Sequence, residues 1–354
     1  MKINKPWFLF FSIKVLYSLI SLFILSSITK IGDSERYINA DLNISLRTFY
    51  DSTAFMDFIG GILGLGGSAF AFLGFAIINL CLTFYALRDF TFTRLQLYTL
   101  LAFLSFPSYL IWTSVPSKEA IVSGFMIILA SDIVRLYFKF NRLNSFVVLL
   151  ALYIIVIFKP QYMPSIIVCY LTGYLFGKKN SNASIFLMVS IIGITAIAIT
   201  LYSFNDVISD TVFRVIRGFD LEAGASREEF WVRPSDWYTK AFEGMLLSFW
   251  GPTFSEAGRS MIVLFVFIES LIITIILITL FFILISNRFR LSFISMLVFS
   301  TLLLLFATYP FGVMNYGSAI RYKQGYYPFL LILFYCIPIF SRMEKRYLGN
   351  TGVL

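Results

Sequence analysis

Residues 260–286 read SMIVLFVFIESLIITIILITLFFILIS and contain a single charged side chain, Glu269. A helix needs about 20 apolar residues to cross the hydrocarbon core of a bilayer, and this stretch exceeds that length. A helix that is apolar on every side cannot face water, so it must be buried in protein or in lipid. The stretch therefore predicts a membrane-spanning helix.

The rest of the chain has the same character. Of its 354 residues, 59% are apolar and 13% are charged, against about 45–50% and about 25% in ordinary globular domains. The mean hydropathy is +0.84. We predict an all-α, polytopic transmembrane helix bundle that forms a single integral membrane domain over residues 1–354. It has about ten spans, at roughly 7–28, 67–87, 95–114, 120–138, 144–158, 163–177, 184–204, 260–286, 291–309 and 326–341.

The distribution of Lys and Arg predicts the orientation of these spans. Cations in short loops stay on the cytoplasmic side of a membrane, and an even number of spans leaves both termini on one side. The loops of that side contain only two acids, Asp89 and Glu344. We therefore expect both termini to be cytoplasmic. The cations of these loops are Lys2, Lys5, Arg88, Arg94, Arg135, Lys139, Arg142, Lys178, Lys179, Arg288, Arg290, Arg342, Lys345 and Arg346.

The same distribution explains the formal net charge of +9. The excess cations mark the cytoplasmic side, so the charge gives no support to a nucleic-acid partner. The chain has no histidine, which excludes a histidine general base, a Ser-His-Asp triad and imidazole metal ligands. Cys81, Cys169 and Cys336 each lie in an apolar run, and we interpret them as core residues rather than as a disulfide or zinc set.

Two outward segments are longer than ordinary loops. The first runs from about residue 29 to 68 and contains a glycine-rich stretch at 60–67, which predicts close helix packing or a re-entrant turn. The second, residues 205–259, is a long loop on the outer side. It carries Trp237, Ala241, Met245 and Phe249 at helical spacing, which indicates an amphipathic helix at the outer interface.

Three outer acids are candidate catalytic residues. Asp33 and Glu35 lie in the sequence GDSERY at 32–37, immediately after the first span, and Glu119 begins the fourth. A carboxylate in such a place can act as a general base or bind a divalent cation. The structural alternative is helix capping, in which Asp33 or Ser34 caps a loop helix and Ser117 caps the fourth span with Glu119 in its first turn.

Cations near these acids are candidate ligands for an anionic substrate. Lys118 lies at a helix N-terminus, where a cation is unfavourable unless an anion faces it. Lys159 lies in a Phe-Lys-Pro turn between two short spans, so we expect it inside the protein near membrane depth, where ionisable groups are functional or paired.

Two further outer segments carry cations. Arg214 and Arg217 are three residues apart in the long loop and could share one face of a helix, from which two guanidinium groups could bind phosphate oxygens. Arg321, Tyr322 and Lys323 precede the last span, where they could bind a pyrophosphate and a sugar face, or form an aromatic belt with snorkelling cations.

Cationic and aromatic groups on the outer face suit an anionic, lipid-linked substrate. Nucleotide donors are absent outside the cytoplasm, whereas a polyprenyl-diphosphate-linked sugar brings its own leaving group, whose charge nearby cations stabilise. Such a reaction needs a base for the acceptor hydroxyl. We expect no cofactor. Asp33 and Glu35 could bind a divalent cation, but their residue types do not decide whether the reaction needs one, so we assign no metal site.

In layout and in short motifs the chain resembles the Wzy-like polymerases of O-antigen and capsular polysaccharide repeat units. The motifs that carry the resemblance are GDSERY at 32–37, WTSVPSKE at 112–119, FKP at 158–160, the long outer loop and RYKQGYYP at 321–328. The resemblance implies polymerisation of undecaprenyl-diphosphate-linked oligosaccharides at the outer face of the bacterial inner membrane. It also implies contact with membrane lipid and a chain-length regulator protein as partners. Related ligases use an outer-loop histidine, a role that this chain cannot fill.

Three other readings stay open. C-type glycosyltransferases similarly place a catalytic acid in the first outer loop, and they transfer one sugar from a polyprenyl phosphate. A transporter of lipid-linked oligosaccharides would need polar groups through the membrane, for which only Lys14, Asp132 and Glu269 qualify. A non-catalytic scaffold is the third.

Overall fold

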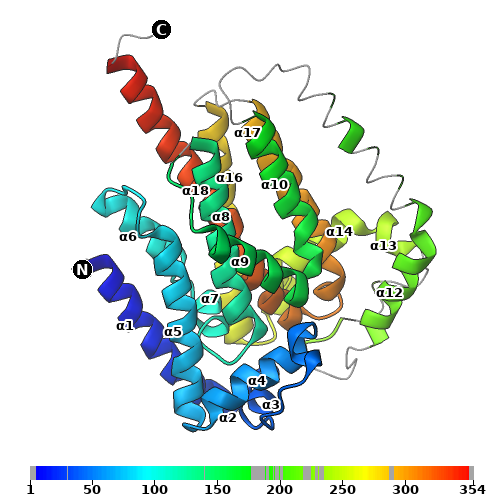
Figure 1. The fold of residues 1–354 in the computed structure, drawn as a ribbon. Helices are drawn as coiled ribbons and strands as arrows, with labels where there is room; N and C mark the ends of the chain where they lie inside the picture. Colours follow the sequence, from blue (N-terminus) through cyan, green and yellow to red (C-terminus); the bar gives the residue numbers. More distant parts are fainter. Residues whose placement is uncertain are drawn as a thin grey trace. The chain divides into compact units, whose positions relative to one another are not determined.

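The computed structural model contains helices throughout and no β-strand among the residues that it describes, apart from an isolated bridge between Ser226 and Asn315. The predicted all-α class is therefore confirmed (Figure 1). The described residues are 5–29, 31–138, 140–176, 188, 191–193, 195, 199, 202–217, 225–227, 230, 235–286 and 291–350. The predicted span 184–204 and the cations Lys2, Lys139, Lys178, Lys179, Arg288 and Arg290 fall largely or wholly outside them.

Five of the described helices are long and apolar enough to cross a membrane, or six if α9 and α10 are counted as one broken span. The five segments are Lys5–Ile28, Ser68–Leu87, Lys118–Phe138, Met261–Ser286 and Leu291–Phe311. Within Met261–Ser286, only 17% of an apolar stretch of 18 residues is buried in protein. An exposed apolar surface of this kind needs lipid around it, so the chain is a membrane protein. The total of about ten spans and the cytoplasmic termini stay predictions.

The predicted span at 95–114 is divided in two. Helix α6 (Arg94–Phe103) and helix α7 (Pro107–Trp112) are separated by a short break, and Phe106 has an extended backbone. Proline disfavours the helical conformation in the residue before it and is well tolerated at the first position of a new helix. Pro107 thus ends the first helix and starts the second. The predicted span at 326–341 lies within the longer helix α18 (Tyr316–Asn350).

The chain forms two compact units, and the first comprises residues 1–132, 142–160 and 324–335. Within it, α1 packs along α5, and the short helices α3 and α4 lie at the end of α5 that is remote from α6 (Figure 1). Its elements are α1 (Lys5–Ile20), a π-helical turn (Ser21–Leu25), α2 (Ser26–Ile28), α3 (Ser34–Ile38), a 3-10 turn (Leu46–Phe49), α4 (Ser52–Gly64), α5 (Ser68–Leu87), α6, α7, most of α8 (Lys118–Phe138), α9 (Ser145–Phe158) and the middle of α18.

A buried lysine forms hydrogen bonds that connect α1, α5 and the end of α7. Lys14 of α1 donates hydrogen bonds to Asn79 Oδ1 of α5 at 2.8 Å and to Thr113 Oγ1, at the end of α7, at 2.6 Å. Asn79 in turn donates to the Ala120 carbonyl and to Ser123 Oγ of α8. Polar bonds of this kind fix the register of helices in lipid, where apolar packing alone is weakly directional.

Glycines allow α3 and the segment after it to pack directly on α4. A Cβ atom added at Gly60 would lie 2.5 Å from the carbonyl oxygen of Tyr37, and one at Gly61 would lie 2.8 Å from that of Ala40. At Gly64 the added atom would meet the carbonyl of Ile38. Small residues permit this backbone approach. The prediction of close packing for the glycine-rich stretch is confirmed.

Replacing Gly60 with alanine is therefore expected to destabilise the segment that contains α3 and α4. The added methyl group meets backbone that cannot rotate away, and overpacking of this kind costs about 1–3 kcal/mol. The measurement is the thermal unfolding midpoint of the purified protein in detergent. Gly258→Ala is the control, because a Cβ there would lie 3.7 Å from the nearest atom, in ordinary contact. Equal midpoints for both variants would contradict the packing.

The second unit comprises residues 133–141, 161–323 and 336–354. In it α10 packs on α17, and a small core of Trp237, Ala241, Tyr309, Val313 and Met314 lies beside α14. Its elements are the end of α8, most of a 3-10 turn (Pro160–Tyr162), α10 (Met163–Phe176), α12 (Asn205–Arg217), α13 (Asp236–Thr239), α14 (Ala241–Trp250), α15 (Phe254–Ala257), α16 (Met261–Ser286), α17 (Leu291–Thr308), a 3-10 turn (Tyr309–Phe311) and both ends of α18. The amphipathic helix predicted from Trp237 to Phe249 is two helices, α13 and α14.

Candidate functional site

Three polar segments that are distant in sequence meet in the first unit. Ser34 Oγ, in the GDSERY segment, donates to the Pro116 carbonyl at 3.0 Å. Two residues further on, Lys118 bonds to the start of α4, and Glu119 forms an ion pair with Lys159. The candidate segments GDSERY (32–37), WTSVPSKE (112–119) and FKP (158–160) thus form one connected structure.

An open pocket lies between α3 and α4. Its volume is about 690 Å³, within the usual range for ligand sites of about 300–1,000 Å³. Asp33 and Glu35, both predicted catalytic residues, lie on its wall and are exposed. We call it the acidic pocket, and its lining is Gly32, Asp33, Glu35, Arg36, Asn39, Ala40, Asp41 and Asp57.

One ion pair spans this pocket. Arg36 of α3 donates to Asp57 Oδ2 of α4 at 3.0 Å, and the remaining lining carboxylates give the pocket a net negative charge. Asp33 is the N-cap residue of α3, yet its side chain makes no capping hydrogen bond to that helix. The Asp33 side chain therefore does not cap α3, which was the structural alternative to a catalytic role.

Lys118 bonds to the N-terminal end of α4. Its Nζ donates to Ser52 Oγ at 2.8 Å and to Thr53 Oγ1 at 3.0 Å, and its side chain is half-buried. Asp57 comes four residues after Thr53, which places it about 6 Å further along the axis of α4, at about 1.5 Å per residue. Lys118 is thus bonded to the helix that supplies Asp57 to the acidic pocket. Ser117 accepts from the Ala120 backbone N–H, as its predicted capping role requires.

Glu119 and Lys159 form a buried ion pair. The distance between Lys159 Nζ and Glu119 Oε1 is 3.4 Å, and their side chains are 5% and 0% exposed. Phe158 packs edge-on against Phe55 of α4, so the turn after α9 is held against α4 as well. The interior location predicted for Lys159 is confirmed. Such a pair is costly to bury and must be kept intact once it is buried.

The other candidate residues belong to the second unit. Helix α12 contains Arg214 and Arg217, and Arg214 is exposed. Arg321, Tyr322 and Lys323 form part of the first turns of α18 rather than a loop. The Arg321 guanidinium lies over the Tyr322 ring at 6.0 Å, and the Tyr322 carbonyl accepts a hydrogen bond from Tyr162 at 3.3 Å.

Lys323 is enclosed by its neighbours. Its Nζ donates to Ser270 Oγ of α16 at 2.7 Å and lies 5.7 Å from the centre of the Phe249 ring. The carboxylate of Glu269, the acid in the most apolar span, attracts it electrostatically. Sequence alone offered Glu269 no partner. In this closed arrangement Lys323 stabilises the contact between α16 and α18, and its role toward a pyrophosphate stays a prediction.

Arg227 has a structural role in the long loop. It binds both oxygens of Glu256 in α15 and donates to the carbonyls of Val313 and Gly251. Burial raises the pKa of Glu256, but hydrogen bonds from Arg227 and Thr253 outweigh it and hold that pKa below its usual value. The neighbouring cation Arg233 lies outside the described residues.

The acidic pocket can accept a proton from a bound hydroxyl and can bind polar groups. Sequence reasoning missed two of its acids, Asp41 and Asp57. Asp57 lies inside the apolar helix α4, and a lone acid in such a helix was the available signal. No group of three or more Asp, Glu or Cys residues in the described ranges is arranged to hold a metal ion. Of the cysteines, Cys169 and Cys336 are buried as predicted, whereas Cys81 is exposed.

Comparison of the chain with models of known protein families, with curated proteins and with solved structures finds no match.

Proposed function

We propose that the protein polymerises undecaprenyl-diphosphate-linked oligosaccharide repeat units into O-antigen or capsular polysaccharide at the outer face of the bacterial inner membrane. The observation that supports the proposal is that the GDSERY segment lines an open acidic pocket and is connected, through hydrogen bonds and an ion pair, to the other two candidate segments. These segments come from the ends of spans that the positive-inside pattern assigns to the outer side.

The chemistry divides between acids and cations. In the proposed reaction a hydroxyl of the acceptor sugar loses its proton to Asp33 or Glu35 and attacks the anomeric carbon of the donor. The bond from that carbon to the diphosphate breaks, and undecaprenyl diphosphate leaves with the electron pair. Because the acidic pocket is net negative, it suits the neutral acceptor sugar better than the diphosphate.

The cationic part of the site is expected to hold the diphosphate. Lys118 is the half-buried cation that bonds to the start of α4, the helix that supplies Asp57 to the acidic pocket. Arg214, Arg217 and Arg321 belong to the second unit and stay candidates from the sequence alone. A cation close to the leaving oxygen stabilises the charge that develops as the bond breaks.

Deletion of the gene tests this function through the banding pattern of the cell's glycans. The expected result is a lipid acceptor that carries a single repeat and no ladder of longer chains. Loss of one sugar from every repeat would instead assign a C-type glycosyltransferase. Accumulation of complete repeats on the cytoplasmic leaflet would assign a transporter, and an unchanged ladder would exclude all three.

A further inference from the structure

A second pocket, separate from the acidic pocket, lies wholly within the second unit. Its volume is about 680 Å³, enough for one or two sugar rings. It is formed by the segment before α12, the start of α12, helix α13 and the end of α17. We call it the aromatic pocket, because the residues that line it include the aromatic side chains Tyr202, Trp237, Tyr238 and Phe306.

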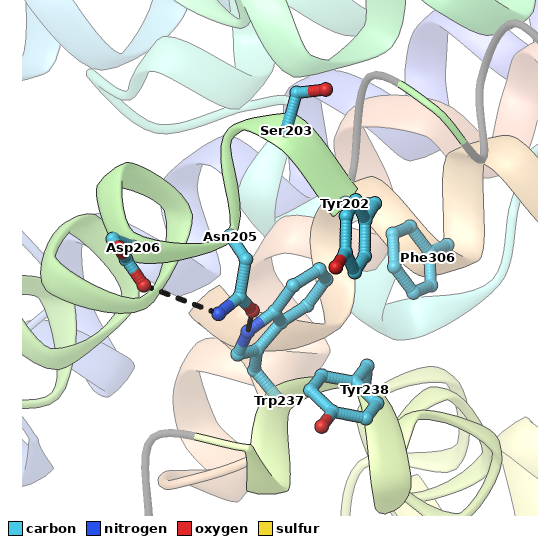
Figure 2. Close-up of a pocket in the computed structure, with 7 residues that line it drawn as sticks. All are labelled: Tyr202, Ser203, Asn205, Asp206, Trp237, Tyr238 and Phe306. Atoms are coloured by element: carbon cyan, nitrogen blue, oxygen red, sulfur yellow. Dashed lines mark hydrogen bonds between the residues drawn. The ribbon is translucent and has the colours of Figure 1, made fainter.

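The aromatic rings gather on one side of this pocket, as Figure 2 shows. Trp237 is only 4% exposed and forms the floor. Its ring centre lies 5.4 Å from that of Tyr238, edge to face, and 6.0 Å from that of Phe306. Tyr238 and Tyr202 are 52% and 86% exposed, so their rings are accessible to a ligand.

The floor of the aromatic pocket is held rigidly. The Tyr309 hydroxyl donates a hydrogen bond to the Trp237 carbonyl, and Trp237 belongs to the small core of this unit. The indole is therefore packed in the core of the second unit and forms one wall of the pocket.

Polar groups occupy the opposite side of the aromatic pocket (Figure 2). Trp237 Nε1 donates to Asn205 Oδ1 at 3.2 Å, which fixes the orientation of the amide. Asn205 Nδ2 then donates to Asp206 Oδ1 at 3.3 Å. An amide nitrogen has two hydrogens and a carboxylate accepts several bonds, so both groups retain capacity for the hydroxyls of a ligand.

The charge of the aromatic pocket indicates which class of ligand it can bind. The described residues that line it include one carboxylate, Asp206, and no cation. A phosphate would be repelled there. A neutral pyranose fits both sides, since its C–H face packs on an aromatic ring and its hydroxyls bond to planar amide and carboxylate groups.

We infer that the aromatic pocket binds a neutral sugar ring of the glycan. The inference rests on the proposed function for the identity of that glycan, and it adds a subsite apart from the acidic pocket. A growing chain that is held at such a subsite stays bound between additions, so the subsite would influence the length of the product.

The test measures binding of free sugars to the purified full chain in detergent by saturation-transfer NMR. The probes are the methyl glycosides of glucose, galactose and N-acetylglucosamine, with benzyl alcohol as an apolar control. At least one glycoside is expected to bind. Tyr238→Ala and Asn205→Ala should each weaken that binding about tenfold, which is about 1.4 kcal/mol. Tyr238→Phe keeps the ring and should bind as the unaltered chain does.

Tyr174→Ala is the matched control, because Tyr174 is 75% exposed on α10 and lies outside the aromatic pocket. Two results would overturn the inference: benzyl alcohol binds and no glycoside does, or Tyr238→Ala leaves glycoside binding intact. These outcomes are independent of the glycan ladder of the deletion strain. If a glycoside binds and the deletion strain keeps an unchanged ladder, the sugar subsite is supported and the proposed polymerase function is rejected.

Discussion

Of the two single variants Asp33→Asn and Glu35→Gln, one is expected to lose most of its polymerisation activity and the other to keep it. Both side chains are exposed on the wall of the acidic pocket. A positioned general base contributes about 10²–10⁴-fold to rate, and each amide variant keeps the size of the acid but cannot accept the proton. The residue whose loss has the larger effect is the base.

The measurement is the rate at which membranes that contain each variant extend a supplied lipid-linked repeat. Asp41→Asn is the control, because Asp41 lines the same pocket and carries no catalytic assignment. Thermal unfolding midpoints should match among the three variants, since exposed isosteric changes rarely alter stability by more than about 0.5 kcal/mol. Full activity in both Asp33→Asn and Glu35→Gln would remove the acidic pocket from the reaction.

A chelator separates proton transfer from metal binding in this experiment. If Asp33 and Glu35 bound a catalytic cation, a strong chelator would reduce the activity of the unaltered chain as much as the mutation does. We expect the unaltered activity to survive the chelator, because proton abstraction by a carboxylate needs no metal.

Apolar length was a reliable guide to the fold. The long apolar stretches became α5, α8, α16 and α17, since lipid or protein must cover such a surface wherever the helix lies. The prediction was less reliable where local chemistry interrupts an apolar run. The break before Pro107 was visible in the sequence Ser105-Phe106-Pro107, and a strict reading of that proline would have divided the span.

The candidate site was predictable in parts but not in its assembly. Residue types identified Asp33, Glu119 and Lys159 one by one, because charged groups beside apolar spans are conspicuous. Their meeting depends on helix packing across gaps of tens of residues, and no local pattern contains that information. The pairing of Glu119 with Lys159 and the contact of Ser34 with Pro116 are results of the tertiary structure.

The buried pair of Glu119 and Lys159 is expected to be essential for long chains, and a double variant can separate its function from its stability. Lys159→Met alone leaves the Glu119 carboxylate buried without this cation. Breaking a buried ion pair in this way costs about 3–5 kcal/mol. The protein level in the membrane should fall, and the ladder of long glycans should disappear with it.

Replacing both partners tests whether stability is the whole effect. In Lys159→Met/Glu119→Leu two apolar side chains of similar size take the place of the charges, and such exchanges are often neutral or stabilising. We therefore expect the double variant to regain normal protein levels and thermal stability. We also expect it to make no long chains, because the proposed reaction would lose the charges of two candidate site residues.

The exposed pair Arg47–Asp51, in the segment between α3 and α4, is the matched control. It joins residues four apart at 2.8 Å, and pairs of this kind contribute about 0.3–0.5 kcal/mol. Arg47→Ala should leave both the protein level and the ladder unchanged. Long chains of normal abundance in the stable double variant would make the buried pair purely structural. Asp33 or Glu35, together with Lys118, would then have to carry the reaction without the buried pair.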